Sequence, residues 1–369
     1  MLGGSSVRVL IWTGTIPTPP SPAVAEALRS VQVTSDARQG DVFQLTFAVA
    51  KGVFDFDLLD TGAMSPMTRV VVAAVFGVVP EVLIDGLVTH VQLAPGDQPG
   101  ESSLTVTGKD LSLAMDLEER NAEYPNQPDF VIFSQLVARY AQYGLIPNPT
   151  PTSDVPIMLD RVPRQAETDL RFIQRMATRN GYVFYIEPVT IGVNRAYFGP
   201  EVRAGFPQSA LTLNMGAHSN VDRIDFQTDA MAPEGTSGSF IEPFTKMALP
   251  IPTLPSLKLP PLSLMPAPPL RKKLFRSTAN ESFSRVAVSA VAAATNSPDA
   301  VRATTEVDAA RYGGVIRSRG VIGVRGVGFQ HDGLYYVQSV THSISQGAYR
   351  QRVSMSREGT GPLLPVVVP

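Results

Sequence analysis

The sequence has 369 residues, no cysteine, and a net charge of −2 from 31 basic and 33 acidic side chains. The lack of cysteine excludes disulfide bonds, thiolate metal sites and cysteine nucleophiles, and the balanced charge gives no general attraction to nucleic acid or an anionic membrane. The length predicts two or three domains. The longest apolar run, residues 70–79, is well short of the ~20 residues of a membrane-spanning helix, so we expect no membrane span.

The N-terminal part divides into a proline-containing start and a series of predicted strands. Four prolines within residues 17–22 disfavour both helix and strand, so we expect residues 1–25 to form an extended tail. From residue 26 to 115, short stretches alternate apolar and polar side chains, as in residues 43–49 and 103–107. This period of two is typical of strands with one buried face.

Helical patterns appear between residues 116 and 200. Asp129 is a candidate N-cap for one helix, and residues 167–180 form a second amphipathic pattern that ends at Gly181. An aromatic strand, residues 182–186, follows directly. This region therefore predicts an α/β domain.

The rest of the chain returns to strands, with two interruptions. Residues 243–269 are rich in proline, which excludes a regular helix, whereas the alanine-rich residues 284–295 favour one. Strands are predicted at residues 210–213, 221–228, 315–329, 334–344 and 349–355.

A short repeat links the two strand-rich regions. The tripeptide Asp-Gly-Leu at 85–87 recurs at 332–334, and Val-Thr-His at 88–90 recurs at 340–342. A turn and an alternating strand follow in both places. Because the copies lie on either side of a different middle region, they indicate a duplicated β-domain.

The sequence offers little catalytic chemistry. Its histidines, His90, His218, His331 and His342, have no partner at metal-ligand spacing, and hydrogen-bonded strand histidines are the simpler interpretation. No phosphate-binding loop or nucleophile elbow is present. We therefore expect no catalytic, cofactor-binding or metal-binding residues, no cofactor, and no enzyme activity.

Four arginines, Arg311, Arg317, Arg319 and Arg325, form a basic stretch without an intervening acid between 308 and 332. One interpretation is the polar side of a surface strand. The other is a basic rim at a subunit contact or channel. Stacking aromatic residues are not interleaved with these arginines, which argues against nucleic-acid recognition.

The proline-rich stretch 243–269 carries apolar side chains between its nine prolines. We expect an extended arm, because proline blocks helix and central strand. Flexible linkers are polar, so we predict that the arm docks on another chain; a flexible insertion loop is the alternative. The candidate contact residues are Leu254, Leu257, Leu259 and Leu262, with residues 271–273 as a solvent-exposed exit.

Residues 161–187 resemble the signature of phage tail hub proteins, which include the late control gene D family, the hub part of VgrG spike proteins and the baseplate hub of T-even phages. The pattern is a helix that leads into an aromatic strand. The matching residues are Thr168, Asp169, Leu170, Phe172, Ile173, Gln174, Arg175, Ala177, Arg179, Gly181 and Tyr182. Two flanking segments, near residues 85–112 and 331–358, are also similar to that family.

The resemblance implies an α+β, mainly β chain with two tube-type β-barrels joined by an α/β insert domain. The expected parts are an extended tail (1–25), a first barrel (26–115), the insert (116–200), a second barrel (201–242 and 271–360), the proline-rich arm (243–270) and a C-terminal tail (361–369). The family has no counterpart of the arm.

The implied function is structural: a baseplate hub of a contractile injection machine, whose homotrimer joins a trimeric spike to a hexameric inner tube. The expected partners are a separate spike protein, the tube protein, other baseplate subunits and a cargo effector, without sequence-specific nucleic-acid binding. The expected location is the bacterial cytoplasm during assembly and then a virion or phage-tail-like particle. The alternatives are a tail-tip protein of a non-contractile phage and a tail-associated cell-wall hydrolase.

Overall fold

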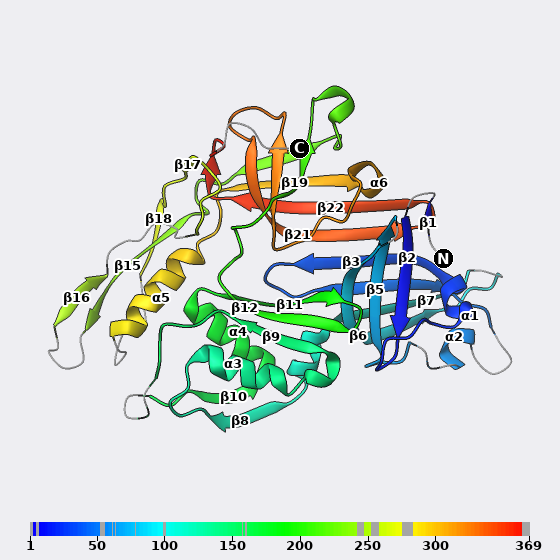
Figure 1. Ribbon diagram of the computed structural model, residues 1–369, viewed down its shortest axis with the longest axis horizontal. Helices are drawn as coiled ribbons and strands as arrows, with labels where there is room; N and C mark the ends of the chain where they lie inside the picture. Colours follow the sequence, from blue (N-terminus) through cyan, green and yellow to red (C-terminus); the bar gives the residue numbers. More distant parts are fainter. Residues whose placement is uncertain are drawn as a thin grey trace.

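The structure of the chain is a computed structural model (Figure 1). It describes residues 3–4, 7–51, 56–60, 62, 64–77, 79–98, 101–156, 158, 161–241, 247–251, 258–274 and 283–363.

A sheet of 13 strands forms the framework of the molecule. Most of its strands belong to two groups, one from each end of the chain. The first group contains β2 (Val7–Thr13), β3 (Leu28–Asp36), β4 (Val42–Ala48), β5 (Arg69–Phe76), β6 (Val79–Ala94) and β7 (Ser103–Asp110). The second contains β13 (Gln208–Thr212), β14 (Ile224–Thr228), β19 (Val301–Asp308), β20 (Val321–Arg325), β21 (Gly333–Ser345) and β22 (Ala348–Arg357).

The two groups repeat one topology. In space the first group has the order β2-β5-β6-β7-β4-β3, and the second has the order β13-β20-β21-β22-β19-β14, so strands at the same place in the chain occupy the same place in the sheet. The one difference in pairing is that β2 lies antiparallel to β5, whereas β13 lies parallel to β20. Among the described strands neither group closes into a complete barrel, because the first and last strands of each group are not paired with each other.

The hydrogen-bond registers of the two groups also agree. Across the first group Val31, Leu45, Val106 and Val91 lie opposite one another in turn, and the same row of the second group contains Ile224, Thr305, Val353 and Val340. Each group also has a β-bulge in the strand that contains the last residue of its row. The bulge lies at residues 88–90 in β6, just before Val91, and at residues 337–339 in β21, just before Val340. The match of bulge and register establishes which residues of the two groups are equivalent.

This equivalence confirms that the β-unit is duplicated. It does not agree with the alignment of the repeated tripeptides in the sequence. The Asp-Gly-Leu of 85–87 is equivalent to residues 334–336, not to 332–334. Likewise, 88–90 is equivalent to 337–339 and not to 340–342. The duplicated strands share a pattern of burial and pairing, which many different side chains satisfy.

The two groups join within the chain through β3 and β21, which pair antiparallel from Ser30 with Ser345 to Asp36 with Ser339 (Figure 1). The hydroxyls of Thr34 and Thr341 lie 3.0 Å apart across this joint. Each group buries its own apolar core, which includes Phe43, Leu45 and Phe47 in the first and Tyr335, Val337 and Val353 in the second.

The insert between the groups is an α/β layer, as the sequence predicts. Its elements are η1 (Leu111–Asp116), β8 (Glu119–Glu123), α3 (Asp129–Ala138), η2 (Ala141–Tyr143), β9 (Leu145–Pro149), β10 (Arg164–Thr168), α4 (Asp169–Asn180), β11 (Val183–Thr190) and β12 (Val193–Gly199). β11, β12 and β9 form a small sheet, and β10 pairs with β8. A third apolar core lies among these elements.

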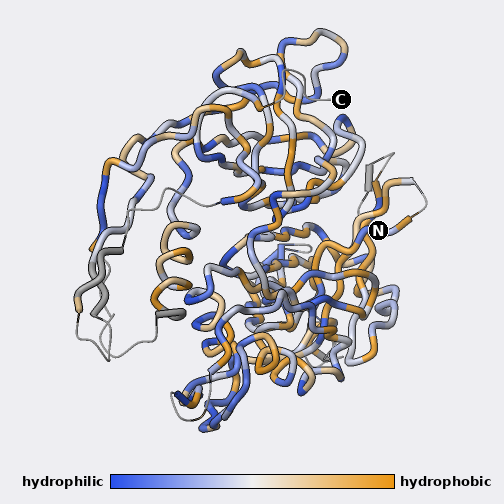
Figure 2. The backbone as a smooth tube through the Cα atoms, turned by 60° about the vertical axis from the view of Figure 1, so that its left-hand side comes forward, coloured by the Kyte–Doolittle hydropathy of each residue, from blue (hydrophilic) through white to orange (hydrophobic). Residues whose placement is uncertain are grey.

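A second insertion separates β14 from β19. It contains β15 (Glu234–Ile241), β16 (Ala248–Ile251), β17 (Met265–Pro266), β18 (Arg271–Leu274) and α5 (Phe283–Thr295). β15, β16 and β18 form a small sheet that projects beside α5 (Figures 1 and 2). The remaining short elements are β1 (Gly3–Gly4), α1 (Pro22–Ala27), α2 (Asp57–Asp60), η3 (Gly216–His218), α6 (Ala309–Tyr312) and β23 (Gly359–Thr360).

The expectation of an extended tail at residues 1–25 is wrong for two segments. β2 belongs to the main sheet, where Val7, Val9 and Ile11 are buried against the first core. α1 begins at Pro22, because proline suits the first turn of a helix. Pairing with β5 and the position of Pro22 thus outweigh the local effect of the prolines.

Candidate interdomain junctions and assembly surfaces

Helix α4 carries the hub-like motif and is defined at both ends. The hydroxyl of Thr168 accepts a hydrogen bond from the backbone N–H of Arg171 at 3.3 Å, as an N-cap does. The helix ends at Gly181, whose φ of +69° is a left-handed value that favours glycine. A side chain there would also approach the Cα of Ala292 in α5 to 2.8 Å, so this glycine allows α5 to lie against α4.

One face of α4 belongs to the core of the insert. Phe172, Ile173 and Met176 are fully buried, and the ring of Phe172 stacks on Tyr124 with 5.7 Å between ring centres. Together with Phe133 of α3 these side chains fill the third core. This part of the motif positions the layer and offers no exposed chemistry.

Asp169 is a buried hydrogen-bond acceptor. Its carboxylate accepts hydrogen bonds from Gln165 Nε2 at 2.6 Å, the Tyr140 hydroxyl at 2.9 Å and Arg139 Nη1 at 3.3 Å. Burial and the contact with Asp169 raise the pKa of Tyr140, so this phenol stays a donor. The ion pair and the hydrogen bonds assign Asp169 a structural role in the insert.

The other face of α4 is open. Leu170 and Gln174 line a cavity of about 230 Å³, and Gln174 and Tyr182 line a neighbouring pocket of about 600 Å³. Arg175 pairs with Glu167 at 2.7 Å and lies over the Phe172 ring. The motif residues therefore lie close together in the structure. Some belong to the third core, and others line the cavity and the neighbouring pocket.

Arg319, which precedes β20 of the second group, contacts both the first group and the insert. The prediction that it lies at an exposed basic rim is wrong, because the side chain is buried. It is 7% exposed, and its Nη1 lies 3.2 Å from Oδ2 of Asp41 in the turn between β3 and β4. Its guanidinium also lies 4.4 Å from the ring centre of Tyr185 in β11. Because Asp41 is 278 residues away in sequence, local sequence context gives no sign of this burial.

The other three arginines have different surroundings. Arg317 pairs with Glu81 at 3.2 Å and Arg311 with Asp222 at 2.5 Å, so both charges are balanced within the chain. Nε of Arg325 is buried and has no hydrogen-bond partner among the described residues. A role of these three residues at a subunit contact remains a prediction.

A buried ion pair that the sequence analysis missed connects the first group to the insert. Arg69 bonds Asp85 twice, at 2.8 and 2.6 Å, and Asn194 of β12 donates to the same carboxylate at 2.8 Å. The signal was present in the sequence, because Asp85 interrupts an apolar strand and a buried carboxylate needs a partner.

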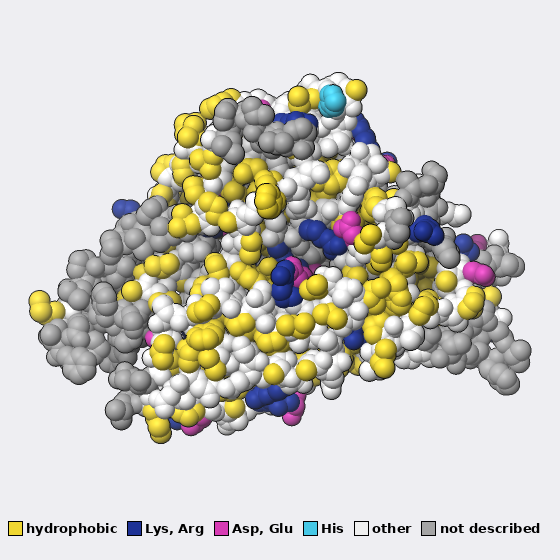
Figure 3. Space-filling view, viewed as in Figure 1, with side chains coloured by type: hydrophobic (Ala, Val, Ile, Leu, Met, Phe, Trp, Pro, Cys, Tyr) yellow, Lys and Arg dark blue, Asp and Glu magenta, His cyan; other side chains and the backbone are white. Residues whose placement is uncertain are grey.

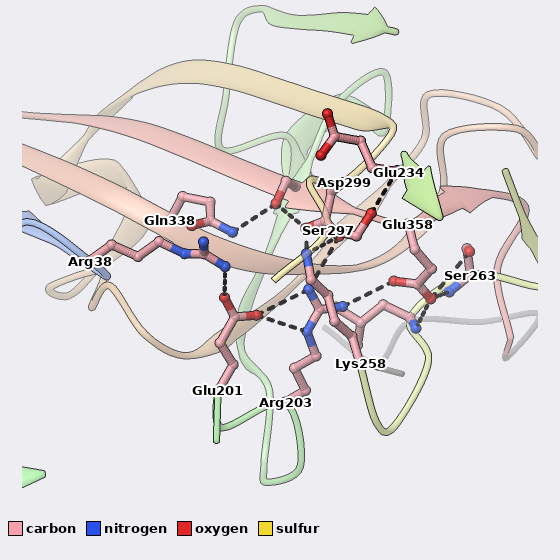
Figure 4. A network of polar contacts seen from close by, with 12 residues as sticks. Arg38, Glu201, Arg203, Glu234, Lys258, Ser263, Ser297, Asp299, Gln338 and Glu358 are labelled. Carbon is pink, nitrogen blue, oxygen red and sulfur yellow. Dashed lines mark hydrogen bonds and ion pairs between the residues drawn. The ribbon is translucent and has the colours of Figure 1, made fainter. Parts of the chain in front are cut away.

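A larger charged cluster lies where the second insertion meets the second group (Figure 4). Its centre is Arg203, whose fully buried side chain bonds Glu201 at 3.3 Å, Asp299 at 3.2 Å and Glu358 at 3.0 Å. Arg38 of the first group reaches the same Glu201 at 2.7 Å. Charged side chains also gather between the upper and lower halves of the molecule in Figure 3.

Part of the proline-rich arm docks on its own chain in this cluster. Lys258 pairs with Asp299 at 2.8 Å, and the backbone N–H of Ser263 donates to Glu358 at 2.8 Å. Leu262 is buried against Ala37 and its neighbours. The prediction of docking on another chain is thus wrong for Leu262, because buried partners for this part of the arm exist within the chain.

The other three candidate contact residues of the arm are Leu254, Leu257 and Leu259. Leu259 is 72% exposed, so its role at a contact stays a prediction. Leu254 and Leu257 lie outside the described residues. The predicted exit, residues 271–273, is exposed in β18, where it pairs with β15.

Two of the histidines contact aromatic side chains. His342 is buried and its Nδ1 lies 2.9 Å from the Tyr349 hydroxyl, while His331 stacks on Phe226. No group of three or more metal-ligating side chains occurs among the residues that the structure describes. Within the same residues, no helix is long and apolar enough to cross a membrane.

Neither the family models nor the curated proteins match the sequence. Solved structures, in contrast, match nearly the whole chain. A tail protein from Neisseria meningitidis MC58 is 12% identical, with a TM-score of 0.65 over 96% of this chain and 97% of that chain. The 43 kDa tail protein of prophage MuSo2 from Shewanella oneidensis is 13% identical, with a TM-score of 0.63 over 96% and 99%.

A component of the type VI secretion system of E. coli, described as similar to the bacteriophage T4 tail proteins gp27 and gp5, is also similar to this chain. It is 12% identical, with a TM-score of 0.54 over 93% of this chain and 77% of that chain. At these identities the likeness concerns the fold. The chain therefore has the mainly β fold of these phage tail proteins and of this type VI secretion component.

Proposed function

We propose that the chain is a structural hub protein of a phage tail or a phage-tail-like injection machine. The observation that carries the proposal is the duplicated strand group, joined through β3 and β21, together with a fold shared over almost the full length of phage tail proteins.

The hub is a homotrimer in this proposal. Each chain contributes two related strand groups, so three chains supply six similar units around one axis. Such a ring presents threefold symmetry to a trimeric spike and near-sixfold symmetry to an inner tube. The spike and the tube are separate proteins, other baseplate subunits contact the outside, and the channel admits a cargo effector.

Light scattering on the purified full chain, alone and mixed with a trimeric spike protein of the same particle, tests this proposal. The expected mass is that of three chains, alone or with one spike. A chain that stays monomeric in both samples, or that forms a hexamer, would contradict it. Co-purification with a contractile sheath supports the contractile machine, whereas a sheathless tail points to a tail-tip protein.

A further inference from the structure

Two strand edges, one in each group, lack a partner among the described residues. The outer edge of β14 is open, because β14 pairs only with β19 among the described strands. The second open edge belongs to the end of β6, residues 90–94, which pairs with β7 on one side only. Backbone donors and acceptors on such edges are available for another strand.

The duplicated topology indicates what these edges bind. β14 is the counterpart of β3, and the end of β6 is the counterpart of the end of β21. In the chain itself β3 and β21 pair with each other over residues 30–36 and 339–345. The same joint, made between copies, would require β14 of one copy and β6 of the next.

We propose that β14 of one chain pairs antiparallel with residues 90–94 of a second copy of this chain. The proposal rests on the proposed trimeric hub, and it names the surface by which the copies join. Transfer of the β3–β21 register places Gln227 opposite Gln92 and Phe226 opposite Leu93. Three chains then close a ring through three internal joints and three joints between copies.

The side chains suit this register. Phe226 and Leu93 are half-buried at their edges, packed against the second and first cores respectively. Their counterparts in the internal joint, Val33 and His342, are buried. Pairing of the two edges would remove the remaining apolar surface of Phe226 and Leu93 from water.

The polar positions agree as well. Gln227 and Gln92 correspond to Thr34 and Thr341, whose hydroxyls are 3.0 Å apart. Two exposed amides in these places can bond each other. By the same register Asp225 falls opposite Ala94 and Asp229 falls opposite His90, so no like charges face each other.

Cross-linking tests the register, because the chain contains no cysteine of its own. Directly opposite residues in an antiparallel pair lie within the Cα separation of a disulfide. In the full-length double variant Gln92→Cys/Gln227→Cys, mild oxidation should produce covalent dimers and trimers on a non-reducing gel. Each single variant should yield only the small amount expected from random collision.

Two further pairs serve as controls. Thr34→Cys/Thr341→Cys should form a disulfide within one chain, which verifies the internal template. Gln92→Cys/Asp225→Cys shifts the partner by two residues and should cross-link at least tenfold less. Equal cross-linking by the shifted pair would overturn the proposed register.

The outcomes separate this inference from the proposed function. A trimer by light scattering that gives no Gln92→Cys/Gln227→Cys cross-link would refute the strand pairing and leave the hub intact. A covalent ladder that extends beyond three chains would support the pairing and contradict the threefold ring. A wild-type chain that is monomeric with and without spike, together with a Gln92→Cys/Gln227→Cys variant that does not cross-link, would reject both.

Discussion

The ammonium of Lys258 lies 2.8 Å from the carboxylate of Asp299, and both side chains are almost fully buried. Lys258 belongs to the proline-rich arm, and Asp299 lies two residues before β19. The pair thus fixes an extended segment, for which local sequence predicts no internal contact, onto the second strand group.

Replacement of Lys258 by methionine should loosen the arm. Asp299 keeps Arg203 and Ser356 as partners, so we expect a loss of about 1–3 kcal/mol in the free energy of unfolding, less than for an isolated buried pair. Urea denaturation measures this loss, and limited proteolysis should show faster cleavage near residues 258–266. Lys272→Met, at an exposed position of β18, is the matched control; equal behaviour of the two variants would contradict the docking.

The Arg319–Asp41 pair should be essential for the junction of the three parts. Arg319→Met leaves a buried carboxylate without its cation, which costs about 3–5 kcal/mol. The double variant Arg319→Met/Asp41→Leu should be less destabilised than the sum of the single variants, because no unpaired charge remains. Denaturant unfolding of the four proteins measures the coupling, and full additivity would refute the pair. Arg311→Met, which removes an exposed ion pair, should cost about 1 kcal/mol or less.

Helix α4 should depend on its buried aromatic residue. Phe172→Ala opens a cavity in the third core, and truncations of this size cost about 3–5 kcal/mol. Thermal or urea unfolding measures the change. Arg171→Ala on the exposed side of the same helix should change stability by about 0.5 kcal/mol or less. A Phe172→Ala protein as stable as Arg171→Ala would show that this face is not packed.

His342 should make stability depend on pH. Burial, and then the charge of Arg317, lower the pKa of His342 from 6.5 to about 3. Because the folded pKa is depressed, the neutral form stabilises the fold above pH 6.5, and this contribution decreases as the pH falls towards 3. The expected decrease is about 1.4 kcal/mol per pH unit within that range.

Unfolding free energies measured from pH 7 to pH 5 test this dependence. His342→Gln removes the titrating group and should flatten the curve relative to the wild type. His218→Gln, at an exposed position of η3, should retain the wild-type slope. If the His342→Gln and wild-type curves run parallel, His342 does not become protonated on unfolding in this range.

The elements with strong local signals were predictable from the sequence. Helix α4 has a threonine cap, an apolar face and a terminal glycine, all within 14 residues, and its predicted span agrees with the structure. The alternation in 43–49 and 103–107 likewise predicts β4 and β7. The resemblance of residues 161–187 to tail hubs also led to the correct fold.

The features that depend on distant partners were not predictable. β2 forms because it pairs with the apolar strand β5, which is distant in the sequence. The prolines at residues 17–22 suggest an extended tail and give no sign of this pairing. Arg319 and Lys258 look like exposed cations in the sequence, and only the fold brings Asp41 and Asp299 to them. The duplication was predicted from two repeated tripeptides. The two groups in fact share strand pairing and burial, and not those tripeptides.

The central claim, that three chains form a ring of six related strand groups, is tested most directly by electron cryomicroscopy of the full chain with its spike. Averages viewed along the spike axis should show three copies, six strand groups and a central channel. The map should also show β14 of each copy beside β6 of the next. A single copy on the spike, or a ring of six chains, would contradict the account.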